Sequence, residues 1–227
     1  MGNNGDFLSG SLRLNHPSMT SGRFYIMRHG ETVYNATRRL QANHIHTPLT
    51  RQGFEQAVAM GCALRQELGE RPQVTLHISD TGRALQTAAL IAEELGLDWF
   101  AGRRTMDLKE IDMGSWCGRS YSDVEDEVGP IVVEDHLLRP APDGEDYPMI
   151  AARLNRWLDG LEDMDGNHIV VMHGISSRVL RGIMAGYPVH PIHGAPIAPS
   201  LVQGSIALVE NGNERVLYGS ERGIEHA

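Results

Sequence analysis

The chain has 227 residues, of which 41% are hydrophobic and 22% charged, and its formal net charge is −9. This composition is ordinary for a globular protein, and the length suits one domain. No apolar run is long enough to cross a bilayer. An acidic chain repels nucleic acid and acidic membrane surfaces. We therefore expect neither a membrane span nor a nucleic-acid partner.

The N-terminal residues and the two cysteines indicate the extent of the folded domain and the compartment of the protein. Residues 1–22 are rich in Gly, Asn and Ser and lack a sustained apolar segment, so they predict a flexible leader and no secretory signal. Cys62 and Cys117 have neither a CxxC partner nor a zinc-ligand spacing, which favours free thiols over a disulfide. We expect a cytoplasmic protein with one folded domain over residues 23–227.

Short apolar runs alternate with amphipathic segments along the first half of the chain. Strands are predicted at 24–27 and 74–79, and residues 34–47 between them predict a loop. Thr50 is the expected N-cap of a helix that closes at Gly69, and a further helix follows the second strand. This order predicts an α/β fold, a three-layer α/β/α sandwich with a mostly parallel central sheet.

The second half of the chain is less regular. From residue 99 to residue 143 the periodicity weakens, apart from a short helix expected after Ser120. The remaining elements are predicted as helices at 150–161 and 175–184, a strand at 168–172, an irregular loop at 187–200 and a hairpin at 205–210 and 215–218.

Basic residues follow three of the predicted strands. Arg28 and His29 come directly after the first strand, Arg83 follows the second, and His173 follows the third. Because side chains at the carboxyl ends of strands converge in one crevice of an open α/β sheet, these residues should build one site. The sequence therefore predicts a strongly cationic pocket that suits phosphate.

The separated motifs resemble those of the histidine phosphatase superfamily, in its phosphoglycerate-mutase-like branch. The resemblance runs from about Arg23 to Val209. Its motifs are, in chain order, Arg28-His29-Gly30-Glu31-Thr32 with Asn35, Pro48-Leu49-Thr50 with Gly53, Ser79 through Arg83 to Gln86-Thr87-Ala88, Leu108-Lys109-Glu110 with Gly114, Trp116 and Gly118, and His173-Gly174. The chain departs from the pattern at Ala42, where the family often has Gly, and over 43–47, which looks one residue longer.

The resemblance implies a mechanism for these residues. His29 would become a phosphohistidine, and His173 would hydrogen-bond the transferring oxygens. Glu110 would protonate the departing alkoxide and later take a proton from water. The cationic neighbours Arg28 and Arg83 disfavour an added proton on His29, and their guanidinium forks suit phosphate oxygens.

The resemblance also implies the substrate contacts and the absence of a cofactor. The expected substrate-binding residues are Asn35, Gly30, Thr32 and Gly174. No metal is required, because the arginines and the second histidine supply the positive charge. His44 with His46, and His190 with His193, are spaced like pairs of metal ligands. Neither pair has a third ligand nearby in sequence, so we expect no metal site.

Three functions fit such a chain: a phosphatase, a cofactor-dependent phosphoglycerate mutase, and a non-catalytic module that binds phosphorylated ligands. The presence of His29, Arg83 and Glu110 favours an enzyme. The stretch 120–147 is acidic and is expected to cover the pocket and repel a second phosphate, and Ile175 replaces the Asn that follows His-Gly in the mutases. We therefore expect a metal-independent, histidine acid phosphatase-like phosphomonoesterase acting on a small phosphorylated metabolite. The identity of the ester and the formation of a homodimer stay open.

Overall fold

The computed structural model describes residues 21–42 and 44–219, so residues 1–20 of the expected leader lie outside the described part. The strands are β1 (Arg23–Arg28), β2 (Thr75–Ser79), β3 (Arg103–Thr105), β4 (Asn167–Met172), β5 (Ile206–Glu210) and β6 (Asn213–Tyr218). The helices are α1 (Val33–Ala36), α2 (Arg51–Leu68), α3 (Gly82–Leu95), α4 (Tyr121–Val128), α5 (Tyr147–Asp159) and α6 (Gly174–Met184).

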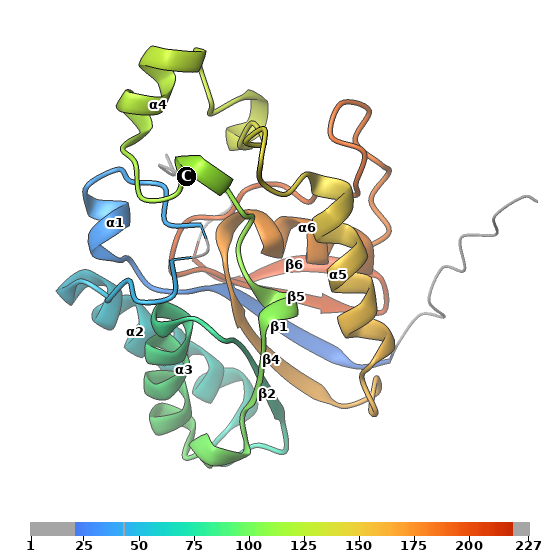
Figure 1. Cartoon of the computed structure of the whole chain (residues 1–227). Helices are drawn as coiled ribbons and strands as arrows, with labels where there is room; N and C mark the ends of the chain where they lie inside the picture. The colour runs from blue at the N-terminus through green and yellow to red at the C-terminus, as the bar shows by residue number, and fades with distance from the viewer. Residues whose placement is uncertain (1–20, 43, 220–227) are drawn as a thin grey trace, which may run out of the picture.

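The six strands form one sheet in the order β3-β2-β4-β1-β5-β6 (Figure 1). β1 pairs with β4, β4 with β2, and β2 with β3, all in parallel. β5 runs antiparallel to both β1 and β6. The mostly parallel sheet expected from the sequence is confirmed. In the register of β1 and β4, Arg28 lies opposite Met172, so the two chain segments leave the sheet side by side.

Helices cover both faces of the sheet because successive side chains of a strand point to opposite faces. Phe24 and Ile26 of β1 pack in the core beneath α5 and α6, whereas Tyr25 and Met27 pack beneath α2 and α3. All four side chains are buried, which explains why β1 reads as a continuous apolar run. Figure 1 shows the two helix pairs on opposite sides of the sheet. The three-layer sandwich is therefore confirmed.

The helix boundaries follow the capping residues identified in the sequence. The Thr50 hydroxyl accepts a hydrogen bond from the Gly53 N–H at 3.1 Å, which begins α2. At the other end of α2, the expected Gly69 has φ 81° and its N–H donates to the Arg65 carbonyl at 2.9 Å.

The predicted loop at 34–47 is wrong at its start, because α1 occupies the first residues. Thr32 caps this short helix through its hydroxyl, and the Asn35 side chain accepts the Thr32 N–H in return. A helix of four residues leaves no periodic pattern to recognise. Strand β3 was also missed, since it is a three-residue edge strand of Arg and Thr.

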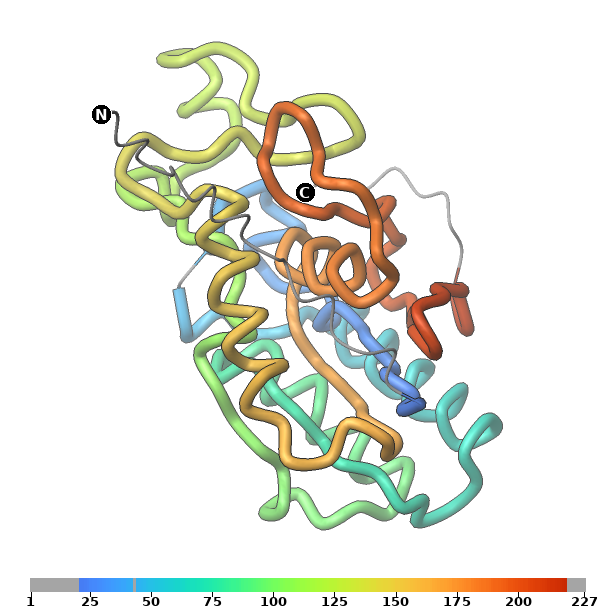
Figure 2. The backbone as a smooth tube through the Cα atoms, turned by 90° about the vertical axis from the view of Figure 1, so that its right-hand side faces the viewer, coloured from blue at the N-terminus to red at the C-terminus, as the bar shows by residue number. Residues whose placement is uncertain are grey.

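Part of the weakly periodic region, residues 99–143, lies at one end of the molecule (Figure 2). Figure 2 shows the segment between α4 and α5 at the same end as the loop 187–200. Trp116, in the middle of the irregular region, is buried in the core that α5 and α6 cover. Trp157 of α5 packs in the same core. The predicted helices at α4, α5 and α6 and the hairpin β5–β6 are present.

Over residues 21–42 and 44–219, no helix combines the length and apolarity that a bilayer crossing requires. Cys62 and Cys117 form no disulfide, as expected.

A buried histidine pair joins β2 to β4 in the core. His77 is 1% exposed, and its Nε2 lies 3.1 Å from Nδ1 of His168. His168 stacks on Phe24, and the edge of His77 meets the ring of Trp157. Burial lowers the pKa of His77 to about 3 and also lowers the pKa of His168.

The first prediction concerns acid stability. A histidine in the unfolded chain has a pKa near 6.5, whereas the pKa values of folded His77 and His168 are lower. As the pH falls below about 6.5, the unfolded chain therefore binds protons that the folded protein does not bind. The free energy of unfolding should therefore fall as the pH drops from about 6.5 towards 3, with a slope of about 1.4 kcal/mol per pH unit for each proton. The double substitution His77→Leu and His168→Leu should flatten this dependence in urea titrations, whereas the exposed control His46→Gln should not. An unchanged slope in the double variant would contradict the assignment.

Candidate active site

A cavity opens at the carboxyl ends of β1, β2 and β4. Six of the nine residues predicted for the site line it, namely Arg28, His29, Asn35, Arg83, Glu110 and Gly174. The other three, His173, Gly30 and Thr32, lie behind this lining. Arg28 and His29 at the end of β1 lie beside Gly174 at the N-terminus of α6, because β1 and β4 are neighbours in the sheet.

His29 is held as a neutral ring with a defined tautomer. Its Nδ1 lies 2.7 Å from the carbonyl oxygen of Gly30, which can only accept, so Nδ1 carries the proton and Nε2 keeps its lone pair. The ring is 2% exposed. Burial, followed by the charges of Arg83 and Arg28, holds the pKa of His29 well below its usual range. A neutral imidazole nitrogen is a competent nucleophile.

Arg83 enters the site from the first turn of α3 and is fully buried, with 0% exposure. Its Nη1 donates to the His44 carbonyl at 2.6 Å and to the Thr47 hydroxyl at 3.1 Å, and its Nη2 donates to the Ala42 carbonyl at 2.7 Å. Burial lowers its pKa to about 10, so it stays charged at neutral pH. The expected phosphate fork is therefore also the anchor of the longer loop 42–47, which reduces the number of N–H groups left for a ligand.

His173 differs most from its predicted role. It is 0% exposed, and both ring nitrogens have protein partners. Nδ1 accepts from Arg83 Nε at 3.3 Å, and Nε2 therefore carries the proton and donates to the Ser79 hydroxyl at 2.7 Å. Its ring meets His29 edge-on, with 5.2 Å between centroids. Burial and Arg83 hold the pKa of His173 well below its usual range. In this arrangement His173 supports the cavity wall from behind.

Asn35 presents its amide to the cavity in a fixed orientation. Its Oδ1 accepts from the Thr32 N–H at 3.1 Å and from Nε2 of Gln203 at 3.3 Å. Because two donors hold the oxygen, the NH₂ group is the part of the amide left to face a ligand. Thr32 itself is fully buried and caps α1, so its role is to place Asn35.

Gln203 is a site residue that the sequence analysis missed. It lies in the loop before β5, and its Nε2 also donates to the His29 carbonyl at 3.1 Å. One amide thus ties the backbone of His29 to the side chain of Asn35. A lone Gln in a loop gives no sequence signal, because its partners come from a segment 174 positions away.

Gly30 allows the loop after β1 to touch the start of α2. A Cβ at Gly30 would lie 2.2 Å from the Gly53 carbonyl oxygen, and a Cβ at Gly53 would lie 2.0 Å from the Glu31 carbonyl oxygen. Neither backbone can tolerate a side chain there. The Gly30 N–H is used by the Thr87 hydroxyl at 3.0 Å. Gly30 therefore shapes the loop that holds His29, and its expected contact with substrate is not part of this arrangement.

Glu110 reaches the N-terminus of α6. One carboxylate oxygen accepts from the N–H groups of Ile111 and Ser176 at 2.9 and 3.0 Å, and the other accepts from Ile175 at 3.1 Å. Two N–H donors at the N-terminus of α6 and a third from the neighbouring residue of the loop complement an ionised carboxylate. Glu110 thus lines the cavity beside Gly174 and Arg28, the latter with its guanidinium carbon 3.4 Å from the position of a Cβ on Gly174.

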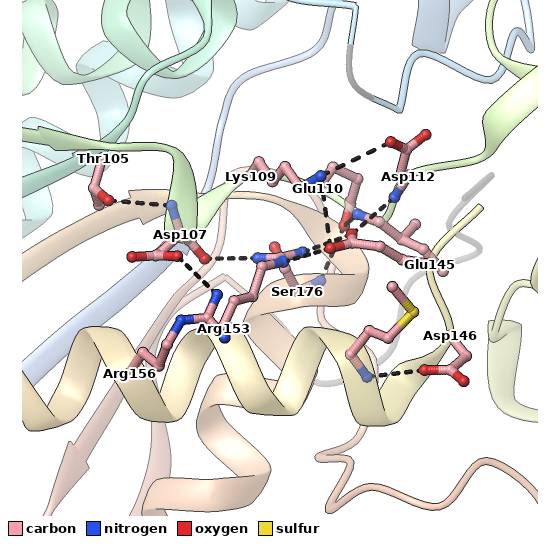
Figure 3. A network of polar contacts seen from close by, with 12 residues as sticks. Thr105, Asp107, Lys109, Glu110, Asp112, Glu145, Asp146, Arg153, Arg156 and Ser176 are labelled. Atoms are coloured by element: carbon pink, nitrogen blue, oxygen red, sulfur yellow. Dashed lines mark hydrogen bonds and ion pairs between the residues drawn. The ribbon is translucent and has the colours of Figure 1, made fainter.

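An ion-pair network fixes the loop that carries Glu110 (Figure 3). Arg153 of α5 binds both carboxylate oxygens of Glu145, at 3.0 and 3.2 Å, and also the Asp107 carbonyl at 2.6 Å. Lys109 lies 3.6 Å from Glu145, whose other oxygen accepts the Asp112 N–H at 3.0 Å. Removing one partner of a buried pair costs about 3–5 kcal/mol, so the network holds this loop firmly.

The stretch 120–147 lines the cavity through Tyr121, His136 and Leu138, but the expected acidic character of this cover is wrong. None of the nine Asp and Glu residues between 120 and 147 lines the cavity described here. Glu145 is turned into the network beneath, Asp143 accepts the Ser115 N–H, and Asp135 pairs with Arg178. A carboxylate with a cationic or N–H partner is drawn towards that partner and away from the cavity.

Of the two histidine pairs with ligand-like spacing, His190 and His193 make local contacts with each other and with the backbone. Nδ1 of His190 accepts the backbone N–H groups of Ile192 and His193 at 3.3 Å, and the rings of His190 and His193 lie 4.8 Å apart. Throughout the described ranges, His, Cys, Asp and Glu form no group of three or more placed to hold a metal ion.

The geometry can be compared with known proteins. The family model of the histidine phosphatase superfamily (branch 1) matches residues 24–217. The chain belongs to this superfamily. A probable phosphoglycerate mutase GpmB from Yersinia pestis is similar, with 31% identity over 173 residues that cover 73% of this chain and 76% of that protein.

Solved structures of this superfamily have the same fold. YhfR from Bacillus stearothermophilus is 25% identical, with a TM-score of 0.66 over 86% of this chain and 95% of that one. A putative alpha-ribazole-5'-P phosphatase from Escherichia coli is 23% identical, with a TM-score of 0.65 over 87% and 95% of the two chains. At this identity the second likeness concerns the fold alone.

The second prediction tests Gln203 as a positioning residue. Gln203→Leu removes both hydrogen bonds, each with a net value of about 0.5–1.5 kcal/mol, so kcat for p-nitrophenyl phosphate should fall about tenfold or more. Gln203→Glu has the same shape, but its carboxylate can only accept hydrogen bonds, as can the His29 carbonyl and Asn35 Oδ1 that face it. This variant should therefore lose at least as much kcat as Gln203→Leu. Thermal unfolding measured alongside separates misfolding from mispositioning. Wild-type kcat in both variants would remove Gln203 from this role.

Proposed function

We propose that the protein is a phosphomonoesterase that works through a phosphohistidine at His29. The observation that carries the proposal is the neutral, buried His29 with its Nε2 lone pair on the lining of a cavity that it shares with Arg28 and Arg83. Phosphoryl transfer is largely a matter of position and of positive charge around the equatorial oxygens. A neutral nucleophile between two guanidinium groups supplies both.

In the first half-reaction, His29 Nε2 attacks phosphorus, and the bond from phosphorus to the ester oxygen breaks. Arg28, Arg83 and the Asn35 NH₂ group stabilise the transferring oxygens. The departing alkoxide takes a proton from Glu110, which must therefore be protonated when the ester binds. The products of this step are the alcohol, the phosphorylated His29 and the Glu110 carboxylate.

In the second half-reaction, water gives a proton to the Glu110 carboxylate and its oxygen attacks phosphorus, so the bond to Nε2 breaks. Inorganic phosphate leaves, and Glu110 is protonated again. The three backbone N–H groups that hold Glu110 fit the carboxylate form that this step requires. His29 retains its Nδ1 proton on Gly30 throughout.

We place no metal in this mechanism, since two guanidinium groups carry the charge that a divalent ion carries in other phosphoryl-transfer sites.

Hydrolysis is favoured over mutase action by the state of the other cations in the cavity. Arg178 and Arg181 of α6 line it, but Arg178 is paired with Asp135, and Arg181 with Glu214. A second phosphate would have to displace the carboxylate of Asp135 from the buried Arg178 side chain, or that of Glu214 from a pair in which both side chains are buried. Much of the remaining lining is apolar and consists of Leu40, Ile111, Met113, Leu138, Ile175, Leu201 and Val202. This lining supports a monophosphate ester as substrate.

Phosphoglycerate mutase activity is the second candidate. The relatives named as probable phosphoglycerate mutases favour it, and so does Arg39, an exposed cation on the cavity lining that donates to the Gly118 carbonyl at 3.0 Å. Under this alternative, Arg39 would hold the second phosphate.

The third prediction separates the two functions. The enzyme should release inorganic phosphate from monophosphate esters without added 2,3-bisphosphoglycerate and after treatment with EDTA, and His29→Ala should abolish release. Rapid quenching of labelled enzyme should give an acid-labile, base-stable phosphate on His29.

Several results would contradict this prediction. Label mapped to another residue would exclude His29 as the nucleophile. Activity that EDTA removes and a divalent metal restores would exclude the metal-free mechanism. Interconversion of 2- and 3-phosphoglycerate well above phosphate release, dependent on the bisphosphate and lost in Arg39→Ala, would establish the mutase instead.

The fourth prediction tests Glu110. Nitrophenolate is a good leaving group and needs little protonation, so Glu110→Gln should slow the burst of p-nitrophenyl phosphate far less than the burst of an alkyl phosphate. The loss for the alkyl ester should be about 10²–10⁴-fold. Equal losses for the two esters in pre-steady-state kinetics would show that Glu110 is not the acid.

A further inference from the structure

Two turns in the described chain share an unusual backbone conformation. In the turn from β5 to β6, Asn211 and Gly212 have φ values of 51° and 73°. In the loop between α4 and α5, Asp135 and His136 have φ values of 56° and 57°, and the Leu137 N–H bonds to the Glu134 carbonyl at 3.3 Å. Positive φ at both central residues is the mark of a type I′ turn.

The two turns differ in how well their residues suit this conformation. Asn-Gly is the preferred pair for a type I′ turn, whereas any residue with a Cβ, His included, is less favourable than glycine at the second central position. The chain therefore carries an unstrained example at Gly212 and a strained one at His136. Strained backbone that is held in place by its surroundings points to a function for the residue concerned.

The surroundings hold the strained turn firmly. The Arg178 side chain, which is nearly buried, donates to the Asp135 carbonyl at 2.7 Å and to the Asp135 carboxylate. On the other side of the turn, the Tyr147 hydroxyl bonds both the N–H and the carbonyl of Leu138 at 3.0 Å. The backbone of 131–139 is closed by the Arg139 N–H to the Ile131 carbonyl at 2.7 Å.

The turn places a polar ring on the wall of the cavity. His136 is exposed and lines the cavity, as does its buried neighbour Leu138. Within the described residues, no hydrogen bond uses a His136 ring nitrogen. An imidazole offers both a donor and an acceptor, and a few polar groups among apolar ones are what orient a ligand in a pocket.

We propose that His136 is a specificity-determining residue that hydrogen-bonds a hydroxyl or carboxyl group on the alcohol part of the substrate. This inference rests on the proposed phosphatase function and narrows its substrate class. The preferred esters carry such a polar group, and simple alkyl phosphates lack the contact. Glycine at position 136 would relieve the backbone of this turn but would offer no side chain to the ligand.

The test compares His136→Gly with the matched control Gly212→His. His136→Gly should raise the Tm, because the strain is relieved. It should lower kcat/KM about five- to tenfold for glycerol phosphate and 3-phosphoglycerate, the value of one hydrogen bond, and leave n-propyl phosphate within about twofold. His136→Asn, which tolerates the turn and keeps a polar side chain, should recover part of the loss. Gly212→His should lower the Tm, because His replaces glycine at a φ of 73°. No atom meets the new Cβ within 4 Å and the turn lies outside the cavity lining, so every kcat/KM should stay unchanged.

Selectivity decides the outcome. A ratio of kcat/KM between polar and alkyl esters that is the same in wild type and His136→Gly overturns the inference, whichever way the Tm moves. An equal loss for all esters also overturns it, since that would mean a structural role. If the wild-type enzyme releases no phosphate from any ester, the proposed function fails. The same ratio measured as binding affinities by calorimetry for glycerol phosphate and n-propyl phosphate then decides the role of His136.

Discussion

The parallel pairing of β1 with β4 is the constraint on which the candidate site depends. It sets Arg28 opposite Met172 and thereby places His29 next to the turn into α6. β2 joins the other edge of β4 and delivers Arg83 to the same end of the sheet. Because both faces of these strands are covered by helices, polar side chains from three distant segments meet at the end of the sheet. A slip of one residue between β1 and β4 would separate the two histidines and turn one of them to the opposite face.

Concentrated positive charge would be unstable at this place without internal partners. The structure satisfies Arg83 with backbone carbonyls of the loop 42–47 and satisfies Arg178 and Arg181 with carboxylates and carbonyls. Only part of the formal charge is therefore presented to the cavity. Burial, together with the charges of Arg83 and Arg28, lowers the pKa of both His29 and His173 and keeps the two rings neutral. The loop of Glu110 is stabilised separately, by the pair of Arg153 and Glu145 beneath it.

The sequence was most informative where local chemistry determines local structure. The buried run of β1, the cap at Thr50 and the end of α2 at Gly69 are short-range features, and the structure agrees with each of them. Features that depend on partners distant in sequence could not be read in this way. Nothing in the sequence shows that Gln203 would meet His29, that Glu145 would turn inward to Arg153, or that the hydrogen-bonding capacity of His173 would be taken by Ser79 and Arg83. The three-residue strand β3 and the four-residue helix α1 are shorter than any periodic signal.

The contact of Gly30 with Gly53 has a consequence for how variation in this protein is interpreted. Neither residue offers a functional group, yet each lies against the backbone of the other at a distance that excludes even a methyl group. In a scan of all substitutions, both positions would be as intolerant as the nucleophile, although one of them belongs to a helix that supplies no side chain to the cavity lining described here. Intolerance to substitution at the start of α2 would therefore report on the geometry of the loop after β1. A survey that took every intolerant position for a catalytic residue would wrongly assign one to α2, outside the cavity lining.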